Sequence, residues 1–163
     1  MGRSDGRPVI RDARDADAGG LIDLIGAIYA EYPGCVLDVD GEAPHLRRPA
    51  SAFSDWGGRL WVAEHDGRLV ACAGFADAGD AIELKHLYVA AAARRRGLGT
   101  HLTRLVERAA GTMGRRCIDL WTDTRFTDAH RMYERLGYVR GALTRELHDL
   151  SGSVEYQYRK HLP

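Results

Sequence analysis

A turn rich in arginine and glycine joins a predicted strand to a predicted helix in the middle of the chain. Residues 94–96 are all arginine, and Gly97 and Gly99 follow them. Residues 82–89 before the turn read as a strand, and apolar residues recur at helical spacing from Leu98 onward. The first N–H groups of a helix lack partners within the helix and lie at the positive end of its dipole. The sequence therefore predicts that this turn binds a phosphate-bearing ligand.

The turn lacks the features of two common phosphate-binding motifs. A dinucleotide-binding fingerprint requires a third glycine three residues after Gly99, where this chain has Leu102. A P-loop requires Gly-Lys-Ser or Gly-Lys-Thr, which the sequence does not contain. The remaining alternative is that the glycines only shape a turn and the arginines form a solvated patch. The strand before the turn and the helix after it favour ligand binding.

Two segments of the chain together resemble a known family. The pattern Arg94-x-x-Gly97-x-Gly99, set after a strand that ends in Leu-Tyr-Val, is similar to the acyl-CoA-binding signature of the GNAT acetyltransferases. Residues 129–138, Ala-His-Arg-Met-Tyr-Glu-Arg-Leu-Gly-Tyr, are similar to the family's helix motif Ala-x-x-Leu-Tyr-Glu-x-x-Gly-Phe. The two segments stand in the family's order and spacing, and the resemblance covers roughly residues 60–145.

The resemblance implies that the phosphate-bearing ligand is acetyl-CoA, the cosubstrate. It also implies that backbone groups of residues 87 and 89 pair with the pantetheine amides as an added strand would. Phe126 stands where the family often has an asparagine that binds the pantetheine. Either an apolar contact replaces this bond, or Arg125 or Thr127 supplies it. The residues expected to contact the cosubstrate are Leu87, Tyr88, Val89, Arg94, Arg95, Arg96, Gly97, Leu98, Gly99, Thr100, Phe126 and Ala129.

Two residues are candidates for moving protons during acyl transfer to an amine. Tyr133 matches the family tyrosine that gives a proton to the departing thiolate, and the alternative is an aromatic residue packed in the core. Glu83 is predicted to share a strand face with Lys85, Leu87 and Val89, where several family members place a carboxylate base. A free glutamate has a pKa of about 4.3, so as a base for an ammonium it needs a raised pKa or a water relay. The alternative for Glu83 is an ion pair with Lys85 or with a cross-strand arginine.

The acceptor is expected to be a primary amine of a small molecule, a peptide or a protein, which attacks directly in a ternary complex. An acidic group follows the first predicted helix and can receive a cationic amine, although such a group is often only a solvated loop. The residues expected to bind the acceptor are Glu31, Tyr32 and Asp38, which stand near Asp40 and Glu42.

A second class of function stays open, that of a catalytically silent GNAT-fold module that senses acyl-CoA. The presence of both Glu83 and Tyr133 favours an acetyl-CoA-dependent N-acyltransferase. His86 and His130 can take part in proton transfer, but lone histidines beside a sheet or on a helix are expected to be structural.

Length and composition agree with a single domain over residues 1–163. The chain has 45% hydrophobic residues and a formal net charge of zero, so we expect no nucleic-acid partner and no membrane partner. No apolar run approaches membrane-spanning length and the first residues lack a signal-peptide core, which favours the cytoplasm. Cysteines at 35, 72 and 117 are too widely spaced for a zinc site, and we expect no metal. The cations are almost all arginine, which indicates a GC-rich bacterial genome, and homodimerisation is left open.

Strands and helices alternate in a mixed order, which predicts an α/β fold with a mixed central sheet of six to seven strands and about four flanking helices. Asp15 or Asp17 is expected to cap the first helix and Thr127 the last. By resemblance, the strands at 82–89 and 116–122 are parallel neighbours that splay apart to admit the pantetheine arm. The expected strands are 8–13, 59–64, 69–76, 82–89, 116–122, 138–146 and 154–160, and the expected helices are 15–32, 98–110 and 127–136, with a short one within 34–58.

Overall fold

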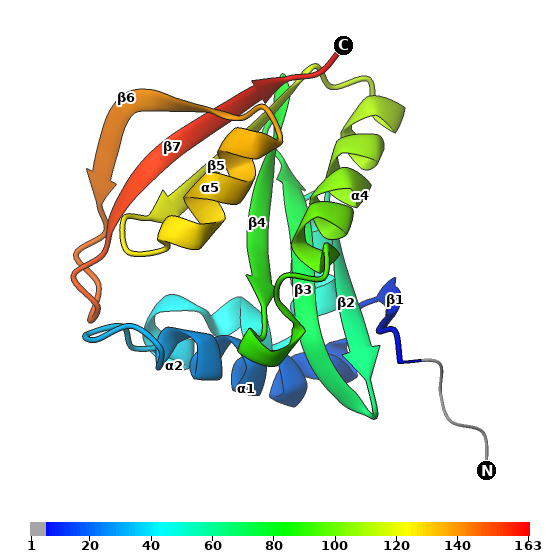
Figure 1. Ribbon diagram of the computed structural model, residues 1–163, viewed down its shortest axis with the longest axis vertical. Helices are drawn as coiled ribbons and strands as arrows, with labels where there is room; N and C mark the ends of the chain where they lie inside the picture. Colours follow the sequence, from blue (N-terminus) through cyan, green and yellow to red (C-terminus); the bar gives the residue numbers. More distant parts are fainter. Residues whose placement is uncertain (1–5) are drawn as a thin grey trace.

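The computed structural model describes residues 6–163 as a seven-stranded mixed sheet with helices on both faces (Figure 1). The strand order is β1-β2-β3-β4-β5-β7-β6, and β4 and β5 are the parallel neighbours. The strands are β1 (Val9–Asp12), β2 (Arg59–His65), β3 (Arg68–Asp77), β4 (Ala81–Val89), β5 (Cys117–Asp123), β6 (Val139–Glu146) and β7 (Val154–His161). The α-helices of the described residues are α1 (Ala18–Tyr29), α2 (Val39–Glu42), α3 (Pro49–Asp55), α4 (Leu98–Thr112) and α5 (Thr127–Arg135). The predicted α/β class, mixed sheet and strand number are confirmed.

The helices bury two separate apolar cores, one on each face of the sheet. On one face, α4 presents Leu102, Val106 and Ala110, which recur every four residues and pack beside Ile82 and Leu84 of β4. On the opposite face the core is formed by α1, α3 and neighbouring strands, with Leu21, Leu24, Ile28, Phe53, Leu60, Val62 and Cys72 as its main members. The strand β4 therefore lies between two helical layers.

The strands β4 and β5 pair over only half of their length. Their register joins residues 81–84 of β4 to residues 117–120 of β5, and the rest of β4 pairs only with β3. Figure 1 shows the two strands diverging beyond this point. The predicted splay of the two parallel strands is confirmed, and it opens the sheet at the carboxyl half of β4.

A bulge in β4 changes which of its residues share a face, so the predicted alternation of this strand is wrong. Between the pairs Cys72–Tyr88 and Gly74–Lys85 the register shifts, and His86 has a φ of 57°. The extra residue reverses the alternation, so Leu87 and Val89 pack with the α4 core. Glu83 and Lys85 therefore lie on the other face, not on the face of Leu87 and Val89 as predicted.

Neither predicted helix cap forms. The carboxylate of Asp17 accepts hydrogen bonds from the Arg11 guanidinium and from the Arg14 N–H, so it does not cap α1, which follows a 3₁₀ turn instead. Asp15 binds Ser51. The last of these helices, α5, already includes Thr127 as its first residue, and its N-terminal flanking position is held by Phe126.

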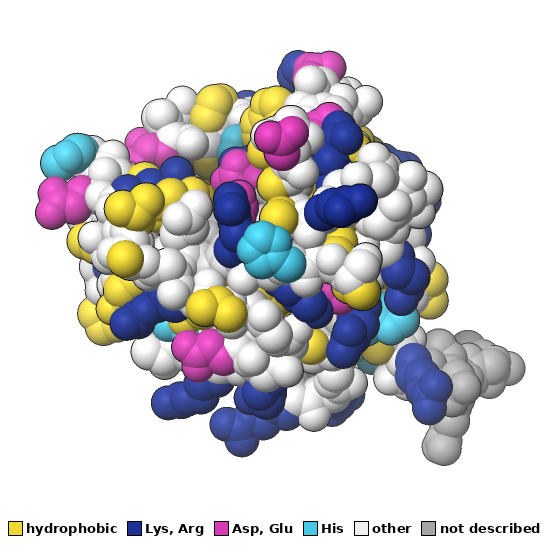
Figure 2. Space-filling view, turned by 90° about the horizontal axis from the view of Figure 1, so that it is seen from above, with side chains coloured by type: hydrophobic (Ala, Val, Ile, Leu, Met, Phe, Trp, Pro, Cys, Tyr) yellow, Lys and Arg dark blue, Asp and Glu magenta, His cyan; other side chains and the backbone are white. Residues whose placement is uncertain are grey.

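The surface is mixed in charge. Figure 2 shows basic and acidic side chains interspersed with apolar ones over one face. Within residues 6–163, no helix is both long enough and apolar enough to cross a lipid bilayer. The same residues contain no group of three or more His, Cys, Asp or Glu side chains that could hold a metal ion.

Candidate active site

Two adjoining cavities lie where β4 and β5 separate. The first, of about 440 Å³, lies between the arginine–glycine turn and α5. The second, of about 320 Å³, is enclosed by β4, β5, the segment after α1 and the loop between β6 and β7. Four residues line both cavities: Leu87, Tyr88, Phe126 and Ala129. The splay therefore places two ligand-sized spaces in contact along the open half of β4.

The turn before α4 presents unpaired backbone donors to the first cavity. Arg95 and Gly97 both have left-handed backbone conformations, with φ values of 62° and 77°. The first backbone bond within α4 runs from the N–H of His101 to the carbonyl of Gly97, and no side chain caps the helix. The N–H groups of residues 98–100 thus lack helical partners and lie in the lining of the cavity. A Cβ atom on Gly97 would meet no atom within 4 Å, so the turn faces open space.

All of the residues predicted to contact the cosubstrate line the first cavity, except Arg96. Gly99 lines this cavity and also lies at the contact between α4 and α5. A Cβ atom there would stand 3.0 Å from Sδ of Met132, so this glycine allows α4 and α5 to pack closely. Two further arginines of α5, Arg131 and Arg135, line the cavity and were missed from the sequence. Their spacing of four residues places both arginines on one face of the helix, and this spacing could have identified them from the sequence.

The open half of β4 has free backbone groups on the side that faces the gap. Ala90 donates its N–H to the carbonyl of Val70, and Tyr88 is paired with Cys72 on the same side. Because alternate residues of an antiparallel strand direct their backbone groups to opposite sides, those of residues 87 and 89 are directed away from β3. The edge that β5 leaves uncovered is therefore the one that the sequence predicted for the pantetheine.

The predicted catalytic residues, Tyr133 and Glu83, both line the second cavity. Tyr133 of α5 is only 4% exposed, and Glu83 enters from β4. Burial raises the pKa of the Tyr133 hydroxyl, so the phenol stays protonated at neutral pH. The ring of Tyr133 packs against those of Tyr138 and Tyr158, with centroids 5.7 and 5.9 Å away. The carboxylate of Glu83 lies 3.4 Å from the ammonium of Lys85, an ion pair that the sequence offered as the alternative.

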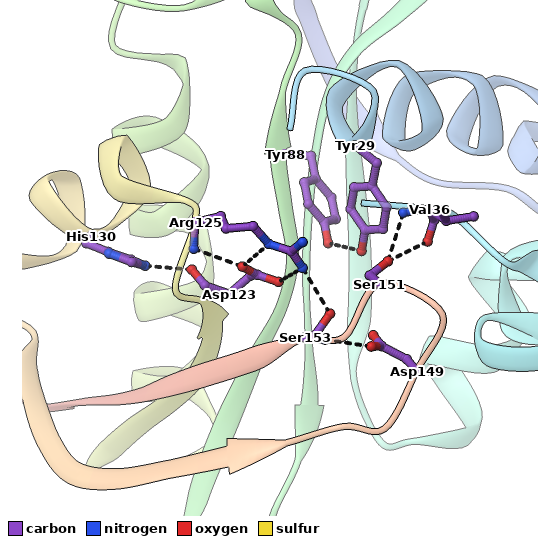
Figure 3. Close-up of polar contacts among 9 residues, drawn as sticks. All are labelled: Tyr29, Val36, Tyr88, Asp123, Arg125, His130, Asp149, Ser151 and Ser153. Atoms are coloured by element: carbon purple, nitrogen blue, oxygen red, sulfur yellow. Dashed lines mark hydrogen bonds and ion pairs between the residues drawn. The ribbon is translucent and has the colours of Figure 1, made fainter. Parts of the chain in front are cut away.

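Hydrogen bonds join the loops that surround the second cavity (Figure 3). The hydroxyl of Ser151 accepts the N–H of Val36 at 2.8 Å and lies 3.1 Å from the carbonyl of the same residue. Asp123, at the end of β5, holds the guanidinium of Arg125 at 2.9 and 2.8 Å. The segment after α1 is therefore attached to the β6–β7 loop, and Arg125 is already occupied by a carboxylate.

The profile of the acetyltransferase (GNAT) family matches residues 25–138. This stretch contains the arginine–glycine turn, Glu83 and Tyr133, and both cavities are built largely from it. The chain belongs to the acetyltransferase (GNAT) family.

Known GNAT proteins agree with this assignment. YjgM of Escherichia coli K12, an uncharacterised N-acetyltransferase, is 29% identical over 137 residues, which are 80% of this chain and 81% of that protein. The structure of a GNAT acetyltransferase from Staphylococcus aureus Mu50 covers 96% of this chain and 99% of its own, with a TM-score of 0.81 and 21% identity. The yncA protein of Salmonella typhimurium, described with its cofactor acetyl-CoA, covers 96% and 95% with a TM-score of 0.72 and 18% identity. At these identities the two structures show a shared fold.

In this GNAT protein the acidic group expected to bind the acceptor does not form one cluster. Glu31 is paired with Arg94 of the turn, and Tyr32 lines the first cavity. Asp38 lines the second cavity, where its carboxylate accepts the N–H of Gly41 at 3.0 Å. Asp40 is paired with an exposed arginine outside the cavities. Of the three predicted acceptor contacts, only Asp38 lies in the second cavity.

Two histidines meet in the second cavity, a contact that the sequence did not predict. The Nε2 atoms of His45 and His86 are 2.5 Å apart, and their rings are stacked. Burial lowers the pKa of both, that of His86 to about 3, so the pair is neutral at pH 7 and one ring donates to the other. His130 is buried and bonds the carbonyl of Asp123 at 2.9 Å, in agreement with the structural role expected for it.

Proposed function

We propose that this protein is an acetyl-CoA-dependent N-acetyltransferase in which the acceptor amine attacks directly within a ternary complex. The observation that supports this most strongly is the contact between the two cavities. The first cavity is lined by the arginine–glycine turn, and the second is lined by Tyr133 and Glu83. A donor in the first and an amine in the second would meet at the shared lining of Leu87, Tyr88, Phe126 and Ala129.

The first cavity fits a long, anionic donor. The N–H groups of residues 98–100 and the guanidinium groups of Arg95 and Arg135 can hold phosphates. The backbone groups of Leu87 and the N–H of Val89 face the gap and can bind amides in the manner of an added strand. Phe126 packs against Tyr32 with ring centroids 4.8 Å apart, so an apolar wall replaces the asparagine common in the family. When bound, acetyl-CoA supplies the activated thioester and a thiol as leaving group.

Tyr133 and Glu83 carry the protons in this proposal. Tyr133 holds a proton on its hydroxyl at neutral pH and donates it to the sulfur that departs, and the second proton that the attacking nitrogen loses restores the phenol. Glu83 receives the proton of the acceptor ammonium, which has a pKa of about 10.4 in water, directly or through a water. Lys85 keeps the Glu83 carboxylate oriented in the lining of the second cavity.

The properties of the cysteines favour direct attack of the amine on the thioester over a mechanism with an acyl-cysteine intermediate. Cys35 is the one that lines the second cavity, and burial raises the pKa of its thiol. Cys72 is fully buried with a pKa raised to about 12, and Cys117 pairs with His161 at the far end of β5. A protonated thiol is a poor nucleophile, so a covalent intermediate on cysteine is disfavoured.

A thiol-release assay tests the function. Acetyl-CoA is mixed with a panel of primary amines and peptide N-termini, and free thiol is followed with a chromogenic reagent. We expect release that depends on both protein and amine, with an equal amount of acetylated amine found by mass spectrometry. Binding of acetyl-CoA without turnover for any amine would instead support the acyl-CoA-sensing module.

A further inference from the structure

All three nitrogen atoms of the Arg94 guanidinium form hydrogen bonds. Its Nη1 and Nη2 atoms lie 2.5 and 2.7 Å from the two carboxylate oxygens of Glu31. Its Nε atom donates to the carbonyl of Val89, the last residue of β4, at 2.9 Å. The side chains of Arg94 and Glu31 are 31% and 34% exposed, so the pair is partly shielded from solvent. This paired geometry leaves the charge of Arg94 neutralised by a carboxylate instead of available to a phosphate.

The two partners of Arg94 belong to the two halves of the site. Val89 lies on the edge of β4 that β5 leaves uncovered, where the donor is proposed to bind. Glu31 follows α1 and begins the segment 31–38, which continues into the lining of the second cavity with Cys35, Val36, Leu37 and Asp38. The same segment is held further along by the hydroxyl of Ser151 on Val36. Arg94 and Ser151 therefore anchor this segment at two points.

We propose that Arg94 is a positioning residue that fixes segment 31–38 against the edge of β4, and that it does not act as a phosphate ligand. The inference rests on the proposed function and deepens it, because it assigns a role to the first residue of the acyl-CoA-binding signature. The bidentate pair sets the distance between segment 31–38, which lines the second cavity, and the edge of β4 at the first cavity. The Nε bond orients the Val89 carbonyl. The phosphates are then left to backbone N–H groups and to Arg95 and Arg135, since Arg131 is paired with the carboxylate of Asp128 at 2.9 Å.

Glu31→Gln separates the two roles because they predict changes of opposite sign in acetyl-CoA affinity. If Arg94 binds a phosphate, removing the Glu31 charge frees the guanidinium and strengthens binding of the anionic ligand. If Arg94 positions the segment, Glu31→Gln weakens binding although a negative charge is lost. Calorimetry with acetyl-CoA is expected to show Glu31→Gln and Arg94→Gln weaker by similar factors, of about threefold to tenfold for a partly exposed pair. The double variant should be no weaker than either single variant.

A conservative variant and a second acyl donor distinguish a folding defect from a loss of positioning. Arg94→Lys keeps the charge but loses the fork and the Nε bond, so it should behave like Arg94→Gln, whereas a phosphate ligand would tolerate it. With S-acetylpantetheine, which lacks phosphates, the fall in kcat/KM caused by Arg94→Gln should persist. Thermal melts show whether each variant is folded.

An effect of Arg94→Gln that is confined to acetyl-CoA would overturn the positioning role, as would tighter binding by Glu31→Gln or wild-type behaviour of both variants. A wild-type protein that binds no acetyl-CoA would overturn the proposed function itself.

Discussion

The Glu83 carboxylate lies 3.4 Å from the Lys85 ammonium, two positions along the same strand and on the cavity side of β4. This pair allows the base role of Glu83 to be tested against a purely structural role. Glu83→Gln should lower kcat/KM for the amine by roughly a hundredfold or more, because the proton acceptor is lost. Lys85→Met removes the same ion pair but keeps the carboxylate. If steady-state kinetics show the same loss in both variants, the ion pair matters and Glu83 is not the base.

Gly97 adopts a φ of 77° with no atom near its Cβ position, so a side chain there strains the backbone without a clash. A β-branched residue at positive φ is a strong outlier, and Gly97→Val should therefore rearrange the turn. We expect acetyl-CoA affinity to fall about tenfold or more, which corresponds to ~1.4 kcal/mol. Gly79→Val is the matched control, since Gly79 has a φ of 85° in open space at the β3–β4 turn. Equal calorimetric affinities for both variants would place the donor elsewhere.

Cys35 offers a test of the kinetic mechanism. Since burial raises the pKa of its thiol, Cys35→Ser should keep turnover within about twofold of wild type. Initial rates measured against both substrates should give intersecting double-reciprocal lines. Parallel lines together with loss of activity in Cys35→Ser would establish an acyl-enzyme and contradict direct attack.

The neutral His45–His86 pair predicts a loss of stability in mild acid. The folded-state pKa of His86, about 3, is below the value of about 6.5 expected for an unfolded chain. As the pH falls below 6.5, the unfolded state gains a proton that the folded state does not, so the free energy of unfolding decreases. One such group contributes up to about 1.4 kcal/mol per pH unit.

The variant His86→Asn checks this prediction, because asparagine tolerates the positive φ of 57° at this position. Denaturant unfolding between pH 6.5 and pH 4.5 should show a shallower decline in this variant than in wild type. Replacing the exposed His101 on α4 with glutamine is the control for loss of an imidazole. A decline as steep as that of wild type would show that His86 does not cause the acid sensitivity.

Features encoded by adjacent residues were predictable from the sequence. The turn at 94–100 and helix α4 follow from local glycine placement and apolar spacing, and the splayed strands followed from the family resemblance. The bulge at His86 has no such signal, because a single residue at positive φ leaves the composition of the strand unchanged. For this reason Glu83 was placed on the wrong face.

Contacts between segments that are distant in the chain could not be predicted from the sequence either. Arg94 and Glu31 are 63 positions apart, and Ser151 and Val36 are 115 positions apart. The sequence predicted that Arg94 contacts the cosubstrate and that Glu31 contacts the acceptor, and it singled out neither Ser151 nor Val36. The packing of α1 against the sheet brings Glu31 to the turn, where it pairs with Arg94. For this reason Glu31 does not lie with Asp38 in the second cavity.

Tyr133 provides the most direct test of the proposed mechanism, by steady-state turnover with a cognate amine. Tyr133→Phe keeps the ring packed against Tyr138 and Tyr158 and removes only the hydroxyl. We predict a fall in kcat of about 10²–10⁴-fold, with acetyl-CoA affinity nearly unchanged. Tyr138→Phe is the matched control, because its hydroxyl is directed to Glu107 and its ring is equally buried. Turnover of Tyr133→Phe within about twofold of the Tyr138→Phe variant would contradict the proposal that Tyr133 donates the proton.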